Sequence, residues 1–85
     1  MTVTLVFLAR LRESFGIAGE QVALPAGVAT VAALRTWLAA RGGVWATEMA
    51  PGRSVRIAIN HDLVASDTAL RDGDEVAFFP PVTGG

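Results

Sequence analysis

TVTLVFLA at residues 2–9 and EVAFF at residues 75–79 are the two stretches that decide the fold of this 85-residue chain. Both are rich in β-branched and aromatic residues, which favour strands. In residues 2–9 the two alternating series of side chains are both largely apolar. A strand with two apolar faces usually lies inside a sheet rather than at its edge. We therefore expect these two strands to lie together in the middle of one sheet.

Three further strands are expected between them. Residues 20–24 (EQVAL) form a short run bounded by turn residues. Residues 54–60 (SVRIAIN) alternate between apolar and other side chains, which is typical of a half-buried strand. A turn at residues 60–62 then leads into a short strand at residues 63–65.

One long helix is expected after Thr30, whose hydroxyl can cap the first turn. The apolar side chains that follow recur at helical spacing and form one stripe: Val31, Leu34, Trp37 and Leu38. Gly42-Gly43 should end this helix, because glycine readily adopts the left-handed conformation that follows many helices. Single helical turns are expected at residues 11–15 and 44–49.

This order of elements predicts an α+β fold. Two strands precede the main helix and the others follow it, which suggests a mixed sheet of about five strands with that helix packed on one face. With the first and last strands in the middle, this is the β-grasp (ubiquitin-like) arrangement. We expect residues 1–79 to form the β-grasp domain and residues 80–85 to form an extended C-terminal Gly-Gly tail.

The composition excludes several classes of function. A net charge of −1 and a sequence pI near 5.6 argue against nucleic acid as a partner, since binding it requires a basic surface. The chain has no cysteine, and therefore no disulfide and no thiol catalysis. A membrane-spanning helix needs an apolar run of about 18 residues, and no run in this sequence is that long. We expect a soluble cytoplasmic protein without a membrane partner.

Candidates for an internal active site are few. His61 is the only histidine, and we expect it in a solvated turn rather than at a metal. Asp72-Gly73-Asp74 lacks the ligand spacing of a calcium loop and predicts another turn, so no metal site is expected. Four arginines could grip an acidic partner, although solvated surface positions are the simpler interpretation: Arg10, Arg12, Arg53 and Arg56.

The C-terminal tail has a different character. Phe78-Phe79 and two prolines precede Gly84-Gly85, and this apolar, conformationally restricted approach is unlike a disordered tail. A free carboxylate is a poor acyl electrophile, but transfer of an adenylyl group from ATP gives it a good leaving group. A backbone without side chains can then reach enzyme active sites through narrow channels. We therefore expect Gly85 to be the reacting residue.

The string DGDEVAFFPPVTGG at residues 72–85 resembles the C-terminal signature of the molybdopterin synthase small subunit family. The similarity extends over essentially the whole chain and includes FLARLRE at residues 7–13, TVAALR at residues 30–35 and AIN at residues 58–60. Members of that family are ubiquitin-like sulfur carriers. The resemblance implies a non-catalytic, sulfur-donating subunit with no permanently bound cofactor.

The resemblance also implies partners and a mechanism. An activating enzyme would use ATP to adenylate Gly85, and a sulfur donor protein would convert the adenylate to a thiocarboxylate. The tail would then donate sulfur to cyclic pyranopterin monophosphate in the large synthase subunit, within a heterotetramer. Gly84 would give the thin approach. The partner-binding residues would be Phe79, Pro80, Pro81, Val82, Thr83, Leu63 and Leu8, with core packing as the alternative for Phe79, Leu8 and Leu63.

Three other functions stay open at this point. The thiamine-pathway sulfur carrier shares the fold, the Gly-Gly end and the activation chemistry, but its tails generally lack the Phe-Phe-Pro-Pro stretch. A ubiquitin-like protein modifier would form isopeptide bonds with lysines of other proteins. An adapter would use the same surface without covalent chemistry.

Overall fold

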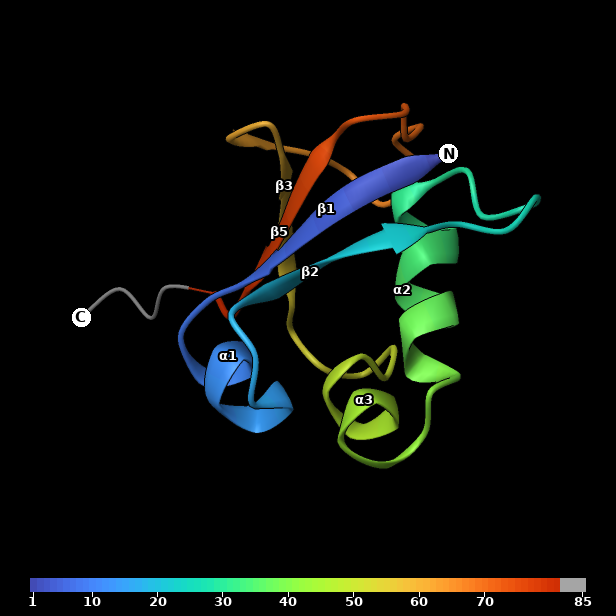
Figure 1. The fold of residues 1–85 in the computed structure, drawn as a ribbon. Coiled ribbons are helices and arrows are strands. Elements are labelled where there is room, and N and C mark those ends of the chain that lie inside the picture. The colour runs from blue at the N-terminus through green and yellow to red at the C-terminus, as the bar shows by residue number, and fades with distance from the viewer. Residues whose placement is uncertain (82–85) are drawn as a thin grey trace.

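The computed structural model describes residues 1–81, and a single sheet organises them. Its strands are β1 (Thr2–Phe7), β2 (Gly19–Ala23), β3 (Arg56–Ile59), β4 (Asp62–Leu63) and β5 (Glu75–Phe79). They lie in the order β2-β1-β5-β3-β4, with β1 and β5 parallel and the other pairs antiparallel. The expected mixed sheet, with the first and last strands together inside it, is confirmed (Figure 1).

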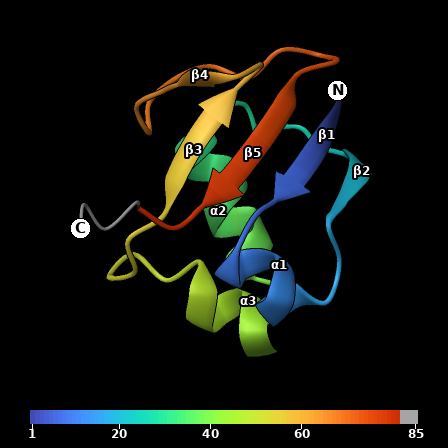
Figure 2. The same ribbon diagram turned by 90° about the vertical axis from the view of Figure 1, so that its left-hand side faces the viewer.

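Three helices lie on one side of this sheet and at one of its ends. The longest, α2 (Val31–Ala39), crosses one face, while α1 (Arg10–Phe15) and α3 (Gly43–Glu48) lie below the sheet (Figures 1 and 2). Thr30 caps α2 as predicted, because its Oγ1 accepts a hydrogen bond of 3.2 Å from the Ala33 N–H. No helix within residues 1–81 is long and apolar enough to span a membrane.

The hydrophobic core fills the space between α2 and the inner face of the sheet. On β1 the side chains of Val3, Leu5 and Phe7 are fully buried, whereas Thr4 on the opposite face is exposed. The core side chains from the helices include Leu11, Val31, Leu34 and Leu38. The opposite, outer face of the sheet has no helix over it in the described part of the chain, and Figure 2 looks onto this face.

Several expected strand boundaries are wrong by one or two residues. The strand expected at residues 2–9 ends at Phe7, because Ala9 has a φ of 52° and turns the chain into α1. The strand expected at residues 54–60 covers only Arg56–Ile59, since β5 ends opposite Arg56 and a turn begins at residue 60. The short strand lies at Asp62–Leu63 rather than at residues 63–65.

The main helix also ends earlier than expected. It stops at Ala39 and has Ala40 in a right-handed conformation as its C-cap, so Gly42-Gly43 does not terminate it directly. Both glycines have positive φ, of 79° and 54°, and they turn the chain from α2 into α3. The predicted left-handed cap on α2 is therefore wrong: Gly42 has φ 79° and ψ −174°, an extended conformation that essentially only glycine adopts, and it precedes the next helix.

Candidate docking face and the root of the C-terminal arm

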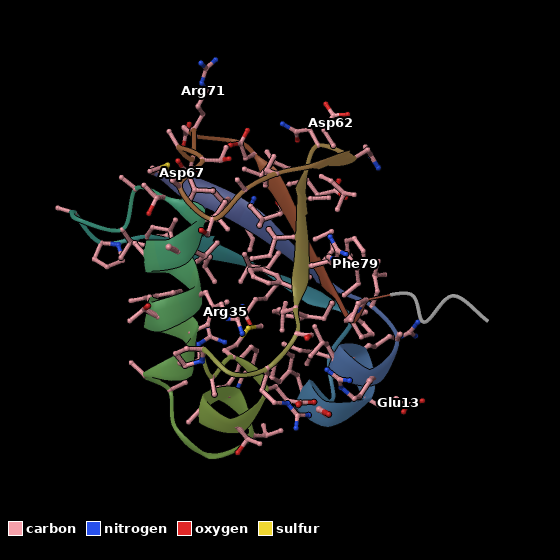
Figure 3. All side chains as sticks on the ribbon, turned by 180° about the vertical axis from the view of Figure 1, so that it is seen from behind. Glu13, Arg35, Asp62, Asp67, Arg71 and Phe79 are labelled. Atoms are coloured by element: carbon pink, nitrogen blue, oxygen red, sulfur yellow. The ribbon has the colours of Figure 1, made fainter. Side chains whose placement is uncertain are left out.

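We call residues 80–85, which follow β5, the C-terminal arm, and two adjacent phenylalanines at the end of β5 lie at its root. Phe78 points inward, is fully buried and lies 5.8 Å from Phe7 between ring centroids. Phe79 points to the outer face and is half-buried (Figure 3). Pro80 and Pro81 follow, and each proline ring fixes φ near about −65°. The arm therefore starts from a strand that the core holds in place.

The anchor under this root is a cluster of aromatic rings. Phe7 packs edge-on against Phe15 of α1 and Trp45 of α3, at centroid distances of 4.9 Å and 5.4 Å. Phe15 and Trp45 are stacked at 3.8 Å, and the Arg41 guanidinium lies 4.5 Å from the Trp45 ring centroid. Edge-to-face and stacked pairs each add stability beyond their buried area. Through Phe7, the two short helices thus support the strand end from which the arm leaves.

A buried carboxylate fastens α1 to α3 beside this cluster. Glu48 is almost fully buried and accepts a hydrogen bond of 2.8 Å from the Ser14 hydroxyl. Its other contacts are ion pairs of 2.6 Å with Arg53 and 3.4 Å with Arg10. The Ser14 hydrogen bond and the two arginines outweigh the cost of burial and lower the pKa of Glu48. The carboxylate is therefore charged at neutral pH.

An apolar row crosses the outer face of the sheet. The strand register places Val6 opposite Ala77, Ala77 opposite Ala58, and Ala58 opposite Leu63. Leu63 is 65% exposed at the open edge, while Ala58 is buried among its neighbours. Since Ala77 and Phe79 are two residues apart on one strand, Phe79 lies on the same face. We call this row together with Phe79 and Leu8 the docking face.

Leu8 extends the docking face beyond the end of β1. Its N–H donates a 3.0 Å hydrogen bond to the carbonyl of Phe78, which brings it to the level at which β5 ends. The next residue, Ala9, has φ 52° and ψ −129°, a conformation that L-residues rarely adopt. Leu8 stays 44% exposed while Leu11, three residues on, is fully buried. A strained turn thus separates a surface leucine from a core leucine.

The structure brings some of the predicted site residues together. Leu8, Leu63 and Phe79 share the outer face, and the core-packing alternative is wrong for Leu8 and Leu63 because both are exposed. Pro80 and Pro81 follow directly and are half-buried. The remaining predicted residues lie outside the described part of the chain: Val82, Thr83, Gly84 and Gly85.

Sequence reasoning missed the three members of the docking face that link these residues: Val6, Ala58 and Ala77. The sequence did contain a signal for Val6. Val6 and Leu8 belong to the second apolar series of residues 2–9, which faces away from the core and is therefore open to another contact. Alanine carries too little apolar surface to be singled out from the sequence. Its position in this face follows only from the register of β3 and β5.

The other candidate sites prove to be structural turns. The β3–β4 hairpin turns at Asn60-His61, both with positive φ, and His61 is exposed there as expected. Asp72 accepts a 2.7 Å hydrogen bond from the Thr2 N–H, and Asp74 accepts bonds from Asn60 and from the Arg71 N–H. These carboxylates fasten turns to the sheet. Within residues 1–81 no three metal-ligating side chains come together.

Comparison with known proteins finds a family model and a curated relative that each match nearly the whole chain. The ThiS family model matches residues 5–85, which is nearly the whole chain. A curated relative, the molybdopterin synthase sulfur carrier subunit of Escherichia coli, is 46% identical over 83 residues, covering 98% of this chain and 99% of the relative.

Two solved structures extend the comparison. The putative molybdopterin converting factor subunit 1 of Pyrococcus furiosus has a TM-score of 0.78 and 32% identity, with 96% of this chain and 99% of that one covered. In Helicobacter pylori, a chain from the complex of subunits 1 and 2 of the molybdopterin-converting factor has a TM-score of 0.67 and 26% identity, with both chains fully covered. These matches confirm the β-grasp fold.

Proposed function

The chain belongs to the ThiS family, and we propose that it carries sulfur as a thiocarboxylate on its last residue, Gly85. It is a sulfur carrier for molybdopterin synthase in molybdenum cofactor biosynthesis, as its 46% identity to such a subunit over nearly its full length indicates. In that role it is the non-catalytic small subunit. The reacting group is the terminal carboxylate, and the partner enzymes supply the catalysis.

Loading of sulfur needs two steps, an adenylyl transfer followed by an acyl transfer. In the first, a Gly85 carboxylate oxygen attacks the α-phosphorus of ATP in the activating enzyme, and pyrophosphate leaves. In the second, sulfur at the oxidation level of sulfide, delivered by a sulfur donor protein, attacks the acyl carbon. The C–O bond to AMP breaks as the C–S bond forms, so no net oxidation occurs. Gly84 and Gly85 suit this chemistry because they present backbone without side chains.

The observation that carries the proposal is how the root of the arm is held. Phe78, the last residue but one of β5, is fully buried in the core, and two prolines follow Phe79 at once. An arm anchored in this way loses less conformational freedom on entering a partner than a freely moving tail would. The described root of the arm, residues 78–81, thus suits an end that another protein's active site receives.

We further propose that the docking face binds the large synthase subunit while the arm enters that subunit's active site. Leu8 and Leu63 are exposed and Phe79 is half-buried on the same apolar face, and aromatic anchors often dominate interface energies. The related Helicobacter pylori chain was solved in complex with subunit 2. Two carriers and two large subunits would form the heterotetramer, and sulfur would pass to cyclic pyranopterin monophosphate.

A reconstitution assay tests this function. Thiocarboxylated chain, purified and mixed with the large subunit, is expected to convert cyclic pyranopterin monophosphate to molybdopterin, and the matched chain lacking Gly85 is expected to give no product. Binding of the truncated chain to the large subunit should persist, because the docking face is intact.

Two other results would contradict the proposal and identify one of the alternative functions. Support of thiazole formation without molybdopterin would identify a thiamine-pathway carrier instead. Stable conjugates on lysines of other proteins, with no sulfur transfer, would identify a protein modifier.

A further inference from the structure

The charged side chains divide unequally between the two ends of the sheet. Far from the arm root lie five carboxylates and one arginine: Asp62, Asp67, Asp72, Asp74, Glu75 and Arg71. Figure 3 shows Asp62, Asp67 and Arg71 together at that end, well away from Phe79. Although the chain as a whole carries a net charge of only −1, this end is strongly acidic.

The end with the arm root has the opposite character. Arg56 is exposed and lies directly across the β3–β5 ladder from Phe79, so its side chain stands beside the arm root. Within residues 1–81 its guanidinium makes no hydrogen bond or ion pair. The neighbouring charges of Arg12 and Glu13 on α1 offset each other.

Arg10 and Arg53 add to this positive charge. Both pair with the single buried carboxylate of Glu48, yet their side chains remain 44% and 43% exposed. Two cations around one buried anion leave an excess positive charge at the surface. Because Arg10 follows Leu8 by two residues, this charge borders the docking face. We call Arg10, Arg53 and Arg56 the arginine rim.

We propose that the arginine rim docks against an acidic surface around the channel mouth of the large synthase subunit, a proposal that rests on the function proposed above. An apolar face supplies affinity, but it does not by itself fix how two proteins approach. Complementary charge speeds association and selects orientation. A molecule that is positive at the arm root and negative at the far end would approach such a mouth with its arm first.

Association kinetics with a pair of matched variants test the rim. Arg56→Glu and Arg71→Glu change the net charge equally, but they lie at opposite ends of the sheet. At about 50 mM salt we expect Arg56→Glu to slow association with the large subunit on the order of tenfold, whereas Arg71→Glu should not slow it. The difference should shrink strongly by about 0.5 M salt, because screening shortens the reach of exposed charges. Arg56→Lys should associate as the wild type does.

The outcomes separate this inference from the proposed function. Equal slowing by both variants would mean that net charge alone acts, and no slowing by Arg56→Glu would mean that the rim has no role; either overturns the inference. Thermal melts of both variants check that they fold. If the wild type, loaded with sulfur, fails to form molybdopterin, the proposed function is wrong. If the wild type forms molybdopterin while Arg56→Glu associates at the wild-type rate, the proposed function stands and only the inference about the arginine rim is wrong.

Discussion

Phe78 and Phe79 are neighbours on β5, but the two faces of the sheet give them different surroundings. Phe78 is fully enclosed by the aromatic cluster and the core, while Phe79 is half-buried on a face that no helix covers in the described part of the chain. Two like side chains, one residue apart, therefore contribute to different properties. The inner one stabilises the fold and fixes the arm root, and the outer one is available to a partner.

The largest effect should come from the inner face. Phe78→Ala removes a fully buried ring that contacts Phe7, and such truncations cost about 3–5 kcal/mol. For a domain of this size that is a large part of the total stability. Urea denaturation should show the loss, and partner binding should fall only in proportion to the unfolded fraction. If Phe78→Ala were as stable as the wild type, the claim that the inner face stabilises the fold would be contradicted.

Phe79→Ala should separate binding from folding. The expected loss is about 2 kcal/mol of docking energy, or roughly 30-fold in Kd for the large subunit. Stability should fall by about 1 kcal/mol or less, since the ring is only half-buried. Gln21→Ala, on the outer face of the edge strand β2, is the matched control and should change neither quantity. Titration calorimetry and denaturation on the same samples measure both, and a wild-type Kd would remove Phe79 from the docking face.

The sequence predicts this contrast in part, because β-strand alternation is local. Residues 2–9 and 75–79 were apolar enough to be placed inside one sheet, and the Thr30 cap follows from the hydroxyl alone. The pairing of Arg56 with Phe79 and the position of Leu63 beside Ala58 depend on register between distant strands, which no local pattern contains. The positive φ of Ala9 could not be predicted either, because alanine does not favour that conformation.

A third prediction concerns Glu48, which links α1 and α3 beside the aromatic cluster under the arm root. Glu48→Gln should cost about 2 kcal/mol at pH 7, because it removes the charge that two arginines and Ser14 stabilise. The lowered pKa of Glu48 means that its contribution is present above the ordinary value of about 4.3 and is lost as the pH falls through the folded-state pKa. The difference in unfolding free energy between wild type and variant should therefore narrow in acid.

Glu13→Gln, at an exposed position on α1, is the control for loss of a carboxylate and should have wild-type stability at pH 7. A wild-type to Glu48→Gln difference that stayed constant down to about pH 3 would show that the Glu48 charge does not stabilise the fold.

Ala9→Gly is the smallest expected effect and the one at the boundary between the faces. Glycine adopts φ 52° without strain, and the relief of about 1–3 kcal/mol outweighs the entropic cost of glycine, for a net gain of about 1 kcal/mol. Ala40→Gly, at a right-handed position, should instead destabilise by up to about 1 kcal/mol. Thermal melts that move both variants in the same direction would show that Ala9 stores no strain.

The central claim is that Gly85, at the end of an arm anchored by Phe78, receives the sulfur. Intact mass measurement after incubation with the activating enzyme, ATP and a sulfur source tests it most directly. We predict that the full chain gains the mass of one oxygen-to-sulfur exchange, located by fragmentation on Gly85, and that the chain lacking Gly85 gains nothing. Unmodified full-length protein in the presence of a competent enzyme, or sulfur loading of the truncated chain, would contradict the account.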